Sequence, residues 1–384
     1  MKVDAAKFAE IPFLDLVAQH APLREEILRV VAEALDSAAF VGGSQVAAFE
    51  EEFGRFVGSR YAVGVSNGTE ALRLALQAMG VGPGARVVTV PNTFIATTEA
   101  ISQVGAQFDF VDVDPRNGLM DPNHLEQYLR ERFDRGPASA RPAAILPVHL
   151  YGQCADMDAI MGLARKYDLL VLEDAAQAHG ATQHGAHAGT FAHAATFSFY
   201  AGKNLGACGE AGAVTTSDPA IAETVRMLRD HGQKLKYLHP IEGCNARLDA
   251  IQAGILRVKL RRLEGWNSAR RALGAFYDAA FAQIDWVEPV RILAGNVPCY
   301  HLYVIHVPRR EALQAHLEAT GIATGLHYPL PLHLQKCYAS LGYAAGRFPN
   351  AERLASRLLS LPMFPELGLD RARRVVEAVA SFGR

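Results

Sequence analysis

Short apolar runs alternate with amphipathic stretches from Tyr61 to Val214. The amphipathic stretches at 70–79, 123–132 and 157–166 carry apolar residues at the spacing of a helix. Alternation of strands with helices is typical of a mostly parallel sheet that helices cover on both faces. The apolar runs predict strands at Tyr61–Val65, Arg86–Val90, Gln107–Val113, Ala143–Val148, Leu169–Leu172, Ala195–Phe199 and Ala211–Thr215.

The chain on either side of this region follows other patterns. Residues 23–37 predict a helix, which we expect the glycines of Phe40-Val-Gly-Gly-Ser44 to end. Apolar residues at helical spacing from Leu248 predict a long amphipathic helix that continues past Trp266. Beyond it, strand and helix patterns mix, with a strand near 302–307, a helix at 311–319 and a last helix near 371–381.

Together these patterns predict an α/β protein of two domains, and 384 residues are enough for two packed cores. We expect a large domain at residues 1–255, which includes an N-terminal arm and the mostly parallel sheet. The long helix then leads into a smaller α+β domain at residues 256–384. Functional residues of such sheets gather where the strands end, and Ser66, Phe94 and Asp174 each follow a predicted strand.

The composition argues against several classes of function. A formal net charge of −2 does not favour a nucleic-acid surface. The five cysteines show no CxxC spacing, and the histidines at 179, 184, 187 and 193 match no metal motif, so we expect no metal site. The chain begins without the apolar core of a secretory leader and has no run of ~18 apolar residues, so we expect a cytoplasmic protein without a membrane segment.

Lys203 points most directly to chemistry, because it lies between an apolar strand and a glycine-rich turn, whereas most lysines keep their ammonium in water. A buried lysine loses its proton more easily, and the neutral amine can form a Schiff base with an aldehyde. Asp174 ends the apolar run Asp168-Leu-Leu-Val-Leu-Glu173. Taken alone it could cap the next helix, but beside Lys203 it suits a protonated pyridine nitrogen. The two residues together indicate pyridoxal 5′-phosphate as the cofactor.

Four further segments support this interpretation: Ser66-Asn-Gly-Thr-Glu-Ala-Leu72, Pro91-Asn-Thr-Phe-Ile-Ala-Thr97, Asn245-Ala-Arg-Leu-Asp249 and His327-Tyr-Pro329. With the segments around Asp174 and Lys203, they give the chain a resemblance, through most of its length, to the sugar aminotransferases of the DegT/DnrJ/EryC1/StrS family. These are fold-type I pyridoxal phosphate enzymes. Ala201 departs from the family's usual proline, and Glu210-Ala211 stands where Asp-Gly or Glu-Gly is frequent. Both departures concern the geometry of the loop rather than the lysine.

The resemblance implies roles for further residues. It places Gly68, Thr69 and Ser198 at the cofactor phosphate, and a glycine at a helix start indeed lets backbone N–H groups bind an anion. It places Phe94 on the pyridine ring and Gln177 near the phenolic oxygen of the cofactor. From the residues alone, Phe94 could equally be part of the core, and Gln177 an amide on a helix surface.

Two more segments have a role that the resemblance implies and an ordinary structural alternative. Asn245 resembles an asparagine that reaches the phosphate of the neighbouring subunit, which would make the protein a homodimer with shared active sites. Its alternative is an Asx turn before the long helix. His327 and Tyr328 resemble part of a loop on the substrate side, and the alternative is a rigid proline-rich turn between domains.

The implied reaction is the transfer of an amino group from L-glutamate to a nucleotide-linked keto-sugar, because sugar dehydratases of this family carry histidine where this chain has Lys203. The segments after Phe197 look most like enzymes that act at C3 of dTDP-3-keto-6-deoxyhexoses. A C4 aminotransferase for UDP- or GDP-4-keto-6-deoxyhexoses is the alternative. A dinucleotide-dependent oxidoreductase is disfavoured because no GxGxxG opens a first βαβ unit. A regulator that kept only the fold would not need Lys203, Asp174 and Ser198 together.

Overall fold

The computed structural model describes residues 10–383, so the start of the chain, on which the expectation of no leader rests, lies outside the described residues. A seven-stranded sheet has the order β1-β9-β8-β5-β4-β2-β3. Only β9 runs antiparallel to its neighbours in this sheet, so the predicted mostly parallel sheet is confirmed. The strands are Tyr61–Val65 (β1), Arg86–Thr89 (β2), Gln107–Phe110 (β3), Ala144–Ile145 (β4), Leu170–Asp174 (β5), Ala194–Ser198 (β8) and Gly212–Thr216 (β9).

Two hydrophobic cores lie against this sheet. Along β9, Val214 belongs to the first core and Ala213 to the second, and successive residues of a strand point to opposite faces. The second core contains residues of α3 (Gly43–Val57) and of the first half of α9 (Ala250–Phe281). The first core contains residues of α4 (Gly68–Ala78), α5 (Ala96–Gln103), α6 (Pro122–Asp134), α7 (Met157–Tyr167) and α8 (Pro219–Leu228).

The glycines at 42 and 43 do not end the predicted helix. That helix, α2 (Arg24–Ser37), ends at Ala38, whose φ of 52° is left-handed. Gly42 and Gly43 have φ values of 68° and 76°, and they make the sharp turn into α3 instead. The sequence prediction missed α3 because it read these glycines as a stop signal only.

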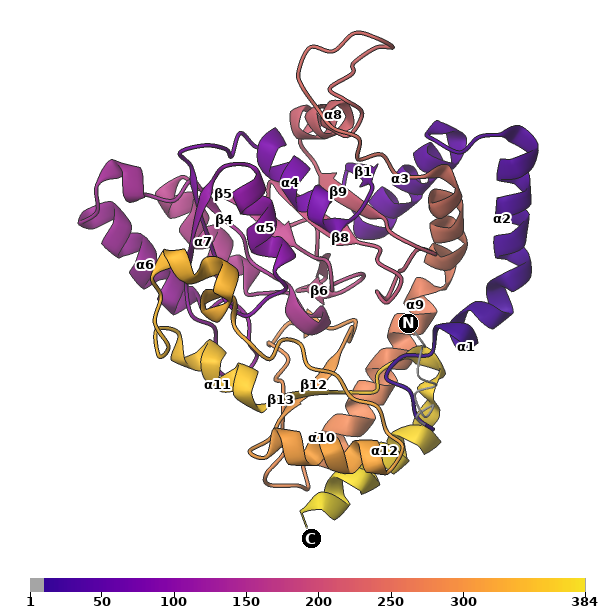
Figure 1. Cartoon of the computed structure of the whole chain (residues 1–384), viewed down its shortest axis with the longest axis vertical. Coiled ribbons are helices and arrows are strands. Elements are labelled where there is room, and N and C mark those ends of the chain that lie inside the picture. The colour runs from indigo at the N-terminus through magenta and orange to yellow at the C-terminus, as the bar shows by residue number, and fades with distance from the viewer. Residues whose placement is uncertain (1–9, 384) are drawn as a thin grey trace.

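The long predicted helix is α9, whose 32 residues begin at Ala250 and continue past Trp266 as expected. At 1.5 Å per residue it is about 48 Å long. Its first half packs in the core beside the sheet, while Leu273, Tyr277 and Phe281 belong to a third core. Figure 1 shows α9 descending from the sheet, with α2 beside it. The expected domain boundary after residue 255 therefore lies inside a continuous helix, and the division into two domains stays a prediction.

The third core belongs to the C-terminal part of the chain. A small antiparallel sheet has the order β10-β12-β13, and the N-terminal residue Ile11 pairs with Ile322 and packs in the same core. The sequence prediction missed β13. This strand has only four residues and begins directly after α11, with no turn residue between the two to mark where the strand starts. The elements are β10 (Glu288–Pro289), β12 (Tyr303–His306), α10 (Arg310–Ala319), α11 (Pro349–Arg357), β13 (Leu358–Leu361) and α12 (Gly368–Phe382).

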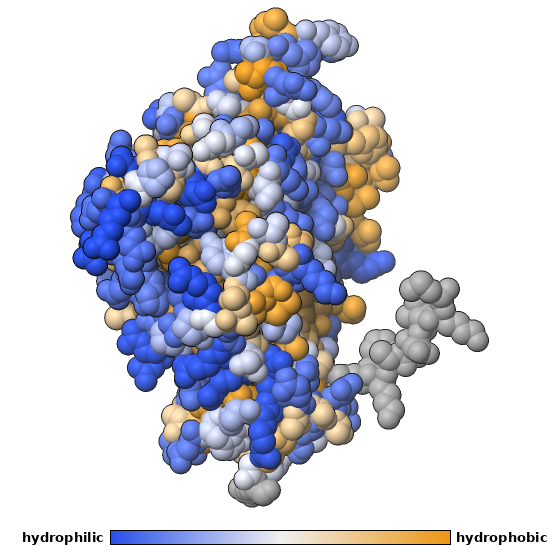
Figure 2. All heavy atoms as spheres, turned by 60° about the vertical axis from the view of Figure 1, so that its left-hand side comes forward, coloured by the Kyte–Doolittle hydropathy of each residue, from blue (hydrophilic) through white to orange (hydrophobic). Residues whose placement is uncertain are grey.

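Short elements complete the chain. A second small sheet has the order β11-β6-β7 and joins residues from both halves of the sequence. Hydrophilic residues prevail on the face around α6 (Figure 2). Between residues 10 and 383, no helix has both the length and the apolar composition to cross a bilayer. The short elements are α1 (Leu16–His20), β6 (Thr182–Gln183), β7 (Ala186–His187) and β11 (Asn296–Val297).

Candidate functional site

A cavity of about 850 Å³ opens at the carboxyl ends of the parallel strands, between the large sheet and the C-terminal part of the chain. This is the edge of an α/β sheet where ligands usually bind. Nine of the ten residues predicted from the sequence line it, and Asn245 does not. The nine are Gly68, Thr69, Phe94, Asp174, Gln177, Ser198, Lys203, His327 and Tyr328.

Lys203 follows β8, in a turn where its backbone N–H donates to the carbonyl oxygen of Tyr200 at 2.8 Å. Its side chain is partly accessible from the cavity and otherwise enclosed by protein. Burial lowers the pKa of Lys203 to about 8, and the nearby carboxylate of Asp174 opposes that shift. At pH 7 about a tenth of this amine is therefore unprotonated, far more than of an ordinary lysine, and a nucleophile or a general base requires this form.

Asp174 is the last residue of β5 and lies at the wall of the same cavity. Its Oδ2 accepts a hydrogen bond of 2.8 Å from the hydroxyl of Thr97, and its Oδ1 accepts one of 3.2 Å from the N–H of Ala176. Burial raises the pKa of the Asp174 carboxyl, while these hydrogen bonds and the charge of Lys203 act in the opposite direction. The carboxylate form would therefore gain from a cationic ligand in the cavity.

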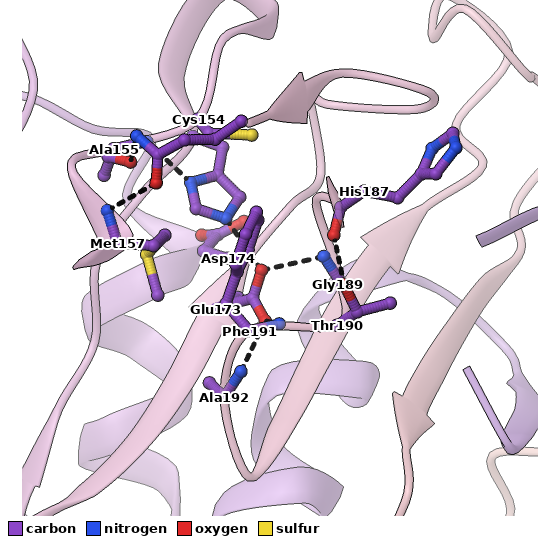
Figure 3. Close-up of polar contacts among 12 residues, drawn as sticks. Cys154, Ala155, Met157, Glu173, Asp174, His187, Gly189, Thr190, Phe191 and Ala192 are labelled. Atoms are coloured by element: carbon purple, nitrogen blue, oxygen red, sulfur yellow. Dashed lines mark hydrogen bonds and ion pairs between the residues drawn. The ribbon is translucent and has the colours of Figure 1, made fainter. Parts of the chain in front are cut away.

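The preceding residue, Glu173, fixes the end of β5 from the other side (Figure 3). Its carboxylate is fully buried and accepts a hydrogen bond of 2.9 Å from Nε2 of His149, whose Nδ1 accepts from the N–H of Ala155 at 3.0 Å. The proton of His149 therefore lies on Nε2. Three backbone N–H groups of one loop complete the shell around the carboxylate at 2.7–3.0 Å, those of Gly189, Phe191 and Ala192.

The amino-terminal end of α4 forms another wall. Asn67 caps this helix, because its side chain accepts from the N–H of Glu70 at 2.9 Å. A Cβ atom on Gly68 would lie 2.6 Å from the Cβ of Ser198, so only glycine lets the helix start approach this serine. The first N–H groups of a helix and its dipole attract anions. Gly68, Thr69 and Ser198 thus surround a position suited to a phosphate group.

Phe94 and Tyr328 stand together at the cavity wall, with ring centroids 5.7 Å apart. Phe94 is 53% exposed, so much of this residue is open to a ligand. A flat ligand could stack on this face with little loss of side-chain entropy.

His327, the neighbour of Tyr328, is held by its own contacts. Its Nδ1 lies 2.9 Å from the hydroxyl oxygen of Ser360, and its ring stacks on Phe13 at 5.6 Å between centroids. Burial lowers the pKa of His327 to about 4, and the charge of Lys203 contributes. This histidine is therefore neutral at physiological pH and adds no positive charge to the cavity.

Among the cavity residues that the sequence did not predict are three polar ones, Thr97, Arg270 and His301. Arg270 is buried on α9, and its Nη1 donates to the carbonyl oxygens of Met363 at 2.6 Å and Tyr300 at 3.1 Å. Thr97 ends the segment Pro91–Thr97, so the sequence could have predicted a role for its hydroxyl. Nothing in the sequence marks Arg270, since a helical arginine in the middle of an amphipathic pattern is usually solvent-exposed.

Asn245 is exposed, and its backbone pairs with that of Asp230 in an isolated antiparallel bridge. The structure therefore does not bring Asn245 into the cavity of its own chain. In the described part of the chain, no group of three or more His, Cys, Asp or Glu side chains is arranged to hold a metal ion.

Comparison with known proteins agrees with the fold class. The model of the DegT/DnrJ/EryC1/StrS aminotransferase family matches residues 22–380. The chain is 44% identical to a pleiotropic regulatory protein of Geobacillus stearothermophilus, over 97% of this chain and 99% of that one. It is 41% identical to the dTDP-3-amino-3,4,6-trideoxy-alpha-D-glucose transaminase of Streptomyces venezuelae, over 97% and 96%. The crystal structure of S. venezuelae DesV in complex with a ketimine intermediate matches with a TM-score of 0.93 and 41% identity, over 97% and 98%.

The lowered pKa of Lys203 predicts a pH dependence of stability for the cofactor-free protein. Its folded-state pKa of about 8 lies below the ordinary 10.5, so the unfolded chain binds more protons between these values and burial of the lysine costs less as the pH rises. We expect Lys203→Met to be more stable than the wild type at pH ~8, and this advantage to shrink by up to about 3 kcal/mol towards pH ~10.5. Urea unfolding across this range measures it.

The exposed Lys236→Met serves as the control, because it removes a lysine without removing a buried charge. A difference between Lys203→Met and the wild type that stays constant over this pH range would contradict the lowered pKa.

Proposed function

Because the chain belongs to the DegT/DnrJ/EryC1/StrS aminotransferase family, we propose that it transfers an amino group from L-glutamate to C3 of a dTDP-3-keto-6-deoxyhexose. Aminotransferases of this family depend on pyridoxal 5′-phosphate. The observation that carries the proposal is the position of Lys203 and Asp174 on one cavity at the strand ends. The transaminase of Streptomyces venezuelae, 41% identical over 97% of this chain, supports the choice of sugar.

The cavity fits pyridoxal phosphate at three points. The start of α4, with Gly68, Thr69 and Ser198, would hold the phosphate, where the close approach at Gly68 leaves room for no side chain. Asp174 would hold the protonated ring nitrogen, and Lys203 the aldehyde carbon. When bound, the cofactor supplies a ring that accepts electrons from the carbon that loses a proton.

Lys203 would move that proton. Its Nζ, whose pKa is about 8 in the cofactor-free protein, would take the proton from the α-carbon of L-glutamate as a base and then release it again as an acid. With the keto-sugar the same amine works in the opposite order. Lys203 is the catalytic residue of this proposal because the transferred proton passes through it.

Asp174 and Gln177 would set the charge around the ring. A cationic nitrogen beside Asp174 offsets the desolvation that now raises the pKa of this carboxyl, and in return the carboxylate keeps the nitrogen protonated. The amide of Gln177 lines the cavity and would donate to the phenolic oxygen. The exposed ring of Phe94 would stack on the pyridine.

A homodimer with shared active sites completes the proposal, with Asn245 of one subunit reaching the phosphate of the other. Support comes from the exposure of Asn245 outside its own cavity and from a set of exposed apolar side chains around α1–α3 that a second copy could cover. The two-domain division, the cytoplasmic location and the substrate contacts of His327 and Tyr328 also stay predictions. The exposed apolar side chains are Val17, Leu28, Leu35, Phe40 and Val41.

A regulator without catalysis is the competing class, and the relative from Geobacillus stearothermophilus bears a regulatory name. Such a protein has no need of an amine with a lowered pKa, a buried carboxylate and a phosphate position around one cavity. All three are present here, and this combination favours the enzyme.

The function is tested in the direction that uses stable sugars. The holoenzyme is incubated with 2-oxoglutarate and dTDP-3-amino-3,6-dideoxy-α-D-galactopyranose, a sugar that amination at C3 of a dTDP-3-keto-6-deoxyhexose would give. UDP- and GDP-linked 4-amino-4,6-dideoxy sugars are tested in parallel. We expect glutamate to form with the dTDP-linked 3-amino sugar at a kcat/KM at least about tenfold above the others, equal to about 1.4 kcal/mol of discrimination. Preference for a 4-amino sugar would shift the assignment to C4. No glutamate with any sugar would contradict the enzyme class.

Lys203→Ala should reduce kcat to less than about a hundredth of the wild-type value while the fold is kept, because proton transfer by a positioned group is worth ~10²–10⁴. Circular dichroism and thermal unfolding report on the fold, and glutamate formation reports on turnover. A variant that kept a larger share of its turnover would remove Lys203 from the catalytic role.

The shared active site predicts complementation between two inactive chains. Lys203→Ala and a bulky Asn245→Trp variant are each inactive, but a heterodimer has one site with both residues intact. Because subunits must exchange, the two variants are refolded together and compared with each refolded alone. We expect activity only in the mixture. Proven heterodimers without activity would contradict the shared active site and leave Asn245 with a purely structural role in the turn before α9.

A further inference from the structure

Tyr151 is a buried residue in an unfavourable backbone conformation next to the cavity. Its φ of 63° is left-handed, which is uncommon for a bulky residue and persists only where surrounding contacts hold it. Its side chain is 5% exposed and it is absent from the cavity wall. It follows β4 in the chain, and it contacts the cavity residue Gln177 without lining the cavity itself.

Both ends of Tyr151 are hydrogen-bonded to residues that line the cavity. Its backbone N–H donates to Oε1 of Gln177 at 2.7 Å, and its phenol donates to the carbonyl oxygen of His327 at 2.7 Å. The first contact belongs to the segment after β5. The second belongs to the loop between α10 and α11, so one tyrosine joins residues that are far apart in the chain.

The contact with Gln177 decides which way its amide points. A backbone N–H only donates, so the atom that faces it must be the amide oxygen, and the NH₂ group must point the other way. One hydrogen of this NH₂ group goes to the hydroxyl of Tyr328 at 3.2 Å. The other hydrogen remains for a ligand in the cavity that Gln177 lines.

These contacts form a closed circuit. It runs from Tyr151 to Gln177, from Gln177 to Tyr328, along the peptide bond to His327, and back to the phenol of Tyr151. Tyr328 also packs against Phe94, with ring centroids 5.7 Å apart. The amide of Gln177 and the loop that carries His327 and Tyr328 are therefore held in one arrangement relative to each other.

We propose that Tyr151 is a positioning residue that makes the Gln177 amide and the His327–Tyr328 loop one unit. This proposal rests on the proposed function for the roles of these two partners: Gln177 towards the cofactor and the loop towards the sugar. Tyr151 does not line the cavity, so it would act on the ligands only indirectly, by keeping the loop against an amide whose direction it also sets.

Hydrogen exchange in the cofactor-free protein tests the coupling without any activity. Tyr151→Phe removes the hydroxyl that donates to the carbonyl of His327, but it keeps the aromatic ring and the backbone N–H that holds Gln177. The amides that report on the 326–330 loop are those of Gly325 and Leu332 at its two ends, which donate to the carbonyl oxygens of Ser360 at 3.0 Å and Pro91 at 2.9 Å. We expect their exchange to become at least about tenfold faster, because one of the contacts that closes the circuit is lost. Unchanged exchange in this loop would overturn the proposal, whatever the substrate proves to be.

Tyr277→Phe is the matched control. Tyr277 is another buried tyrosine whose phenol donates to a backbone carbonyl, that of Pro362, at 3.1 Å, but it belongs to the core of the C-terminal part. Both variants should lower the thermal midpoint by similar amounts, while only Tyr151→Phe speeds exchange of the Gly325 and Leu332 amides. Equal acceleration in both variants would show a general loss of stability and would also overturn the proposal.

The holoenzyme supplies the functional half of the test. With dTDP-3-amino-3,6-dideoxy-α-D-galactopyranose and 2-oxoglutarate, Tyr151→Phe should raise KM for the sugar about tenfold, while the single-turnover rate with L-glutamate stays within about twofold. Tyr328→Phe opens the same circuit, so the double variant should lose less kcat/KM than the product of the two single losses. Fully multiplicative losses would overturn the coupling.

The two proposals fail in different ways. If the wild type transaminates none of the sugars, the proposed function fails, and the exchange result still decides whether Tyr151 holds the loop. If the wild type is active and Tyr151→Phe raises neither the exchange rate nor the KM, only the positioning role fails.

Discussion

The end of β5 carries two adjacent carboxylates, and the division between them underlies the whole site. Successive residues of a strand point to opposite faces, so Glu173 turns into the protein and Asp174 into the cavity. Glu173 is fully buried and accepts hydrogen bonds from His149 and from the loop at 189–192. A buried charge is tolerated only when its acceptors are satisfied in this way. These hydrogen bonds hold the strand end in place. Asp174 has fewer hydrogen-bond partners, and a cationic ligand could offset the free-energy cost of burying its charge.

Burial also decides which groups in the cavity carry charge. It lowers the pKa of His327 to about 4 and that of His301 well below its ordinary value, so both rings are neutral. Burial lowers the pKa of Lys203 only to about 8, since Asp174 opposes the shift. The neutral histidines can offer hydrogen bonds without repelling a protonated lysine, and the amine can change its protonation state near neutral pH. This is the condition that proton transfer requires.

The cavity exists because two packed regions meet over it. Helix α9 belongs to the core beside the large sheet and to the C-terminal core, and Arg270 on this helix donates to the carbonyl of Met363. Tyr151 makes a second connection, through the carbonyl of His327. Contacts of this kind set the distance between the residues proposed to hold the cofactor and those proposed to meet the sugar.

The sequence by itself determined the strands of the large sheet and the long helix, and it predicted that Lys203 and Asp174 belong to one site, which they do as residues of one cavity. Apolar periodicity is a local property, and a lysine between an apolar strand and glycines is visible without a structure. Tertiary structure alone decided that β9 runs antiparallel and that Gly42 and Gly43 turn the chain into α3. It also decided that Arg270 lines the cavity and that Tyr151 contacts residues of its wall. Strand direction depends on partners far along the chain, and a glycine with positive φ can end one helix or begin the next. The hydrogen bonds of Tyr151 join residues that no local pattern relates, so only the folded chain could bring them together.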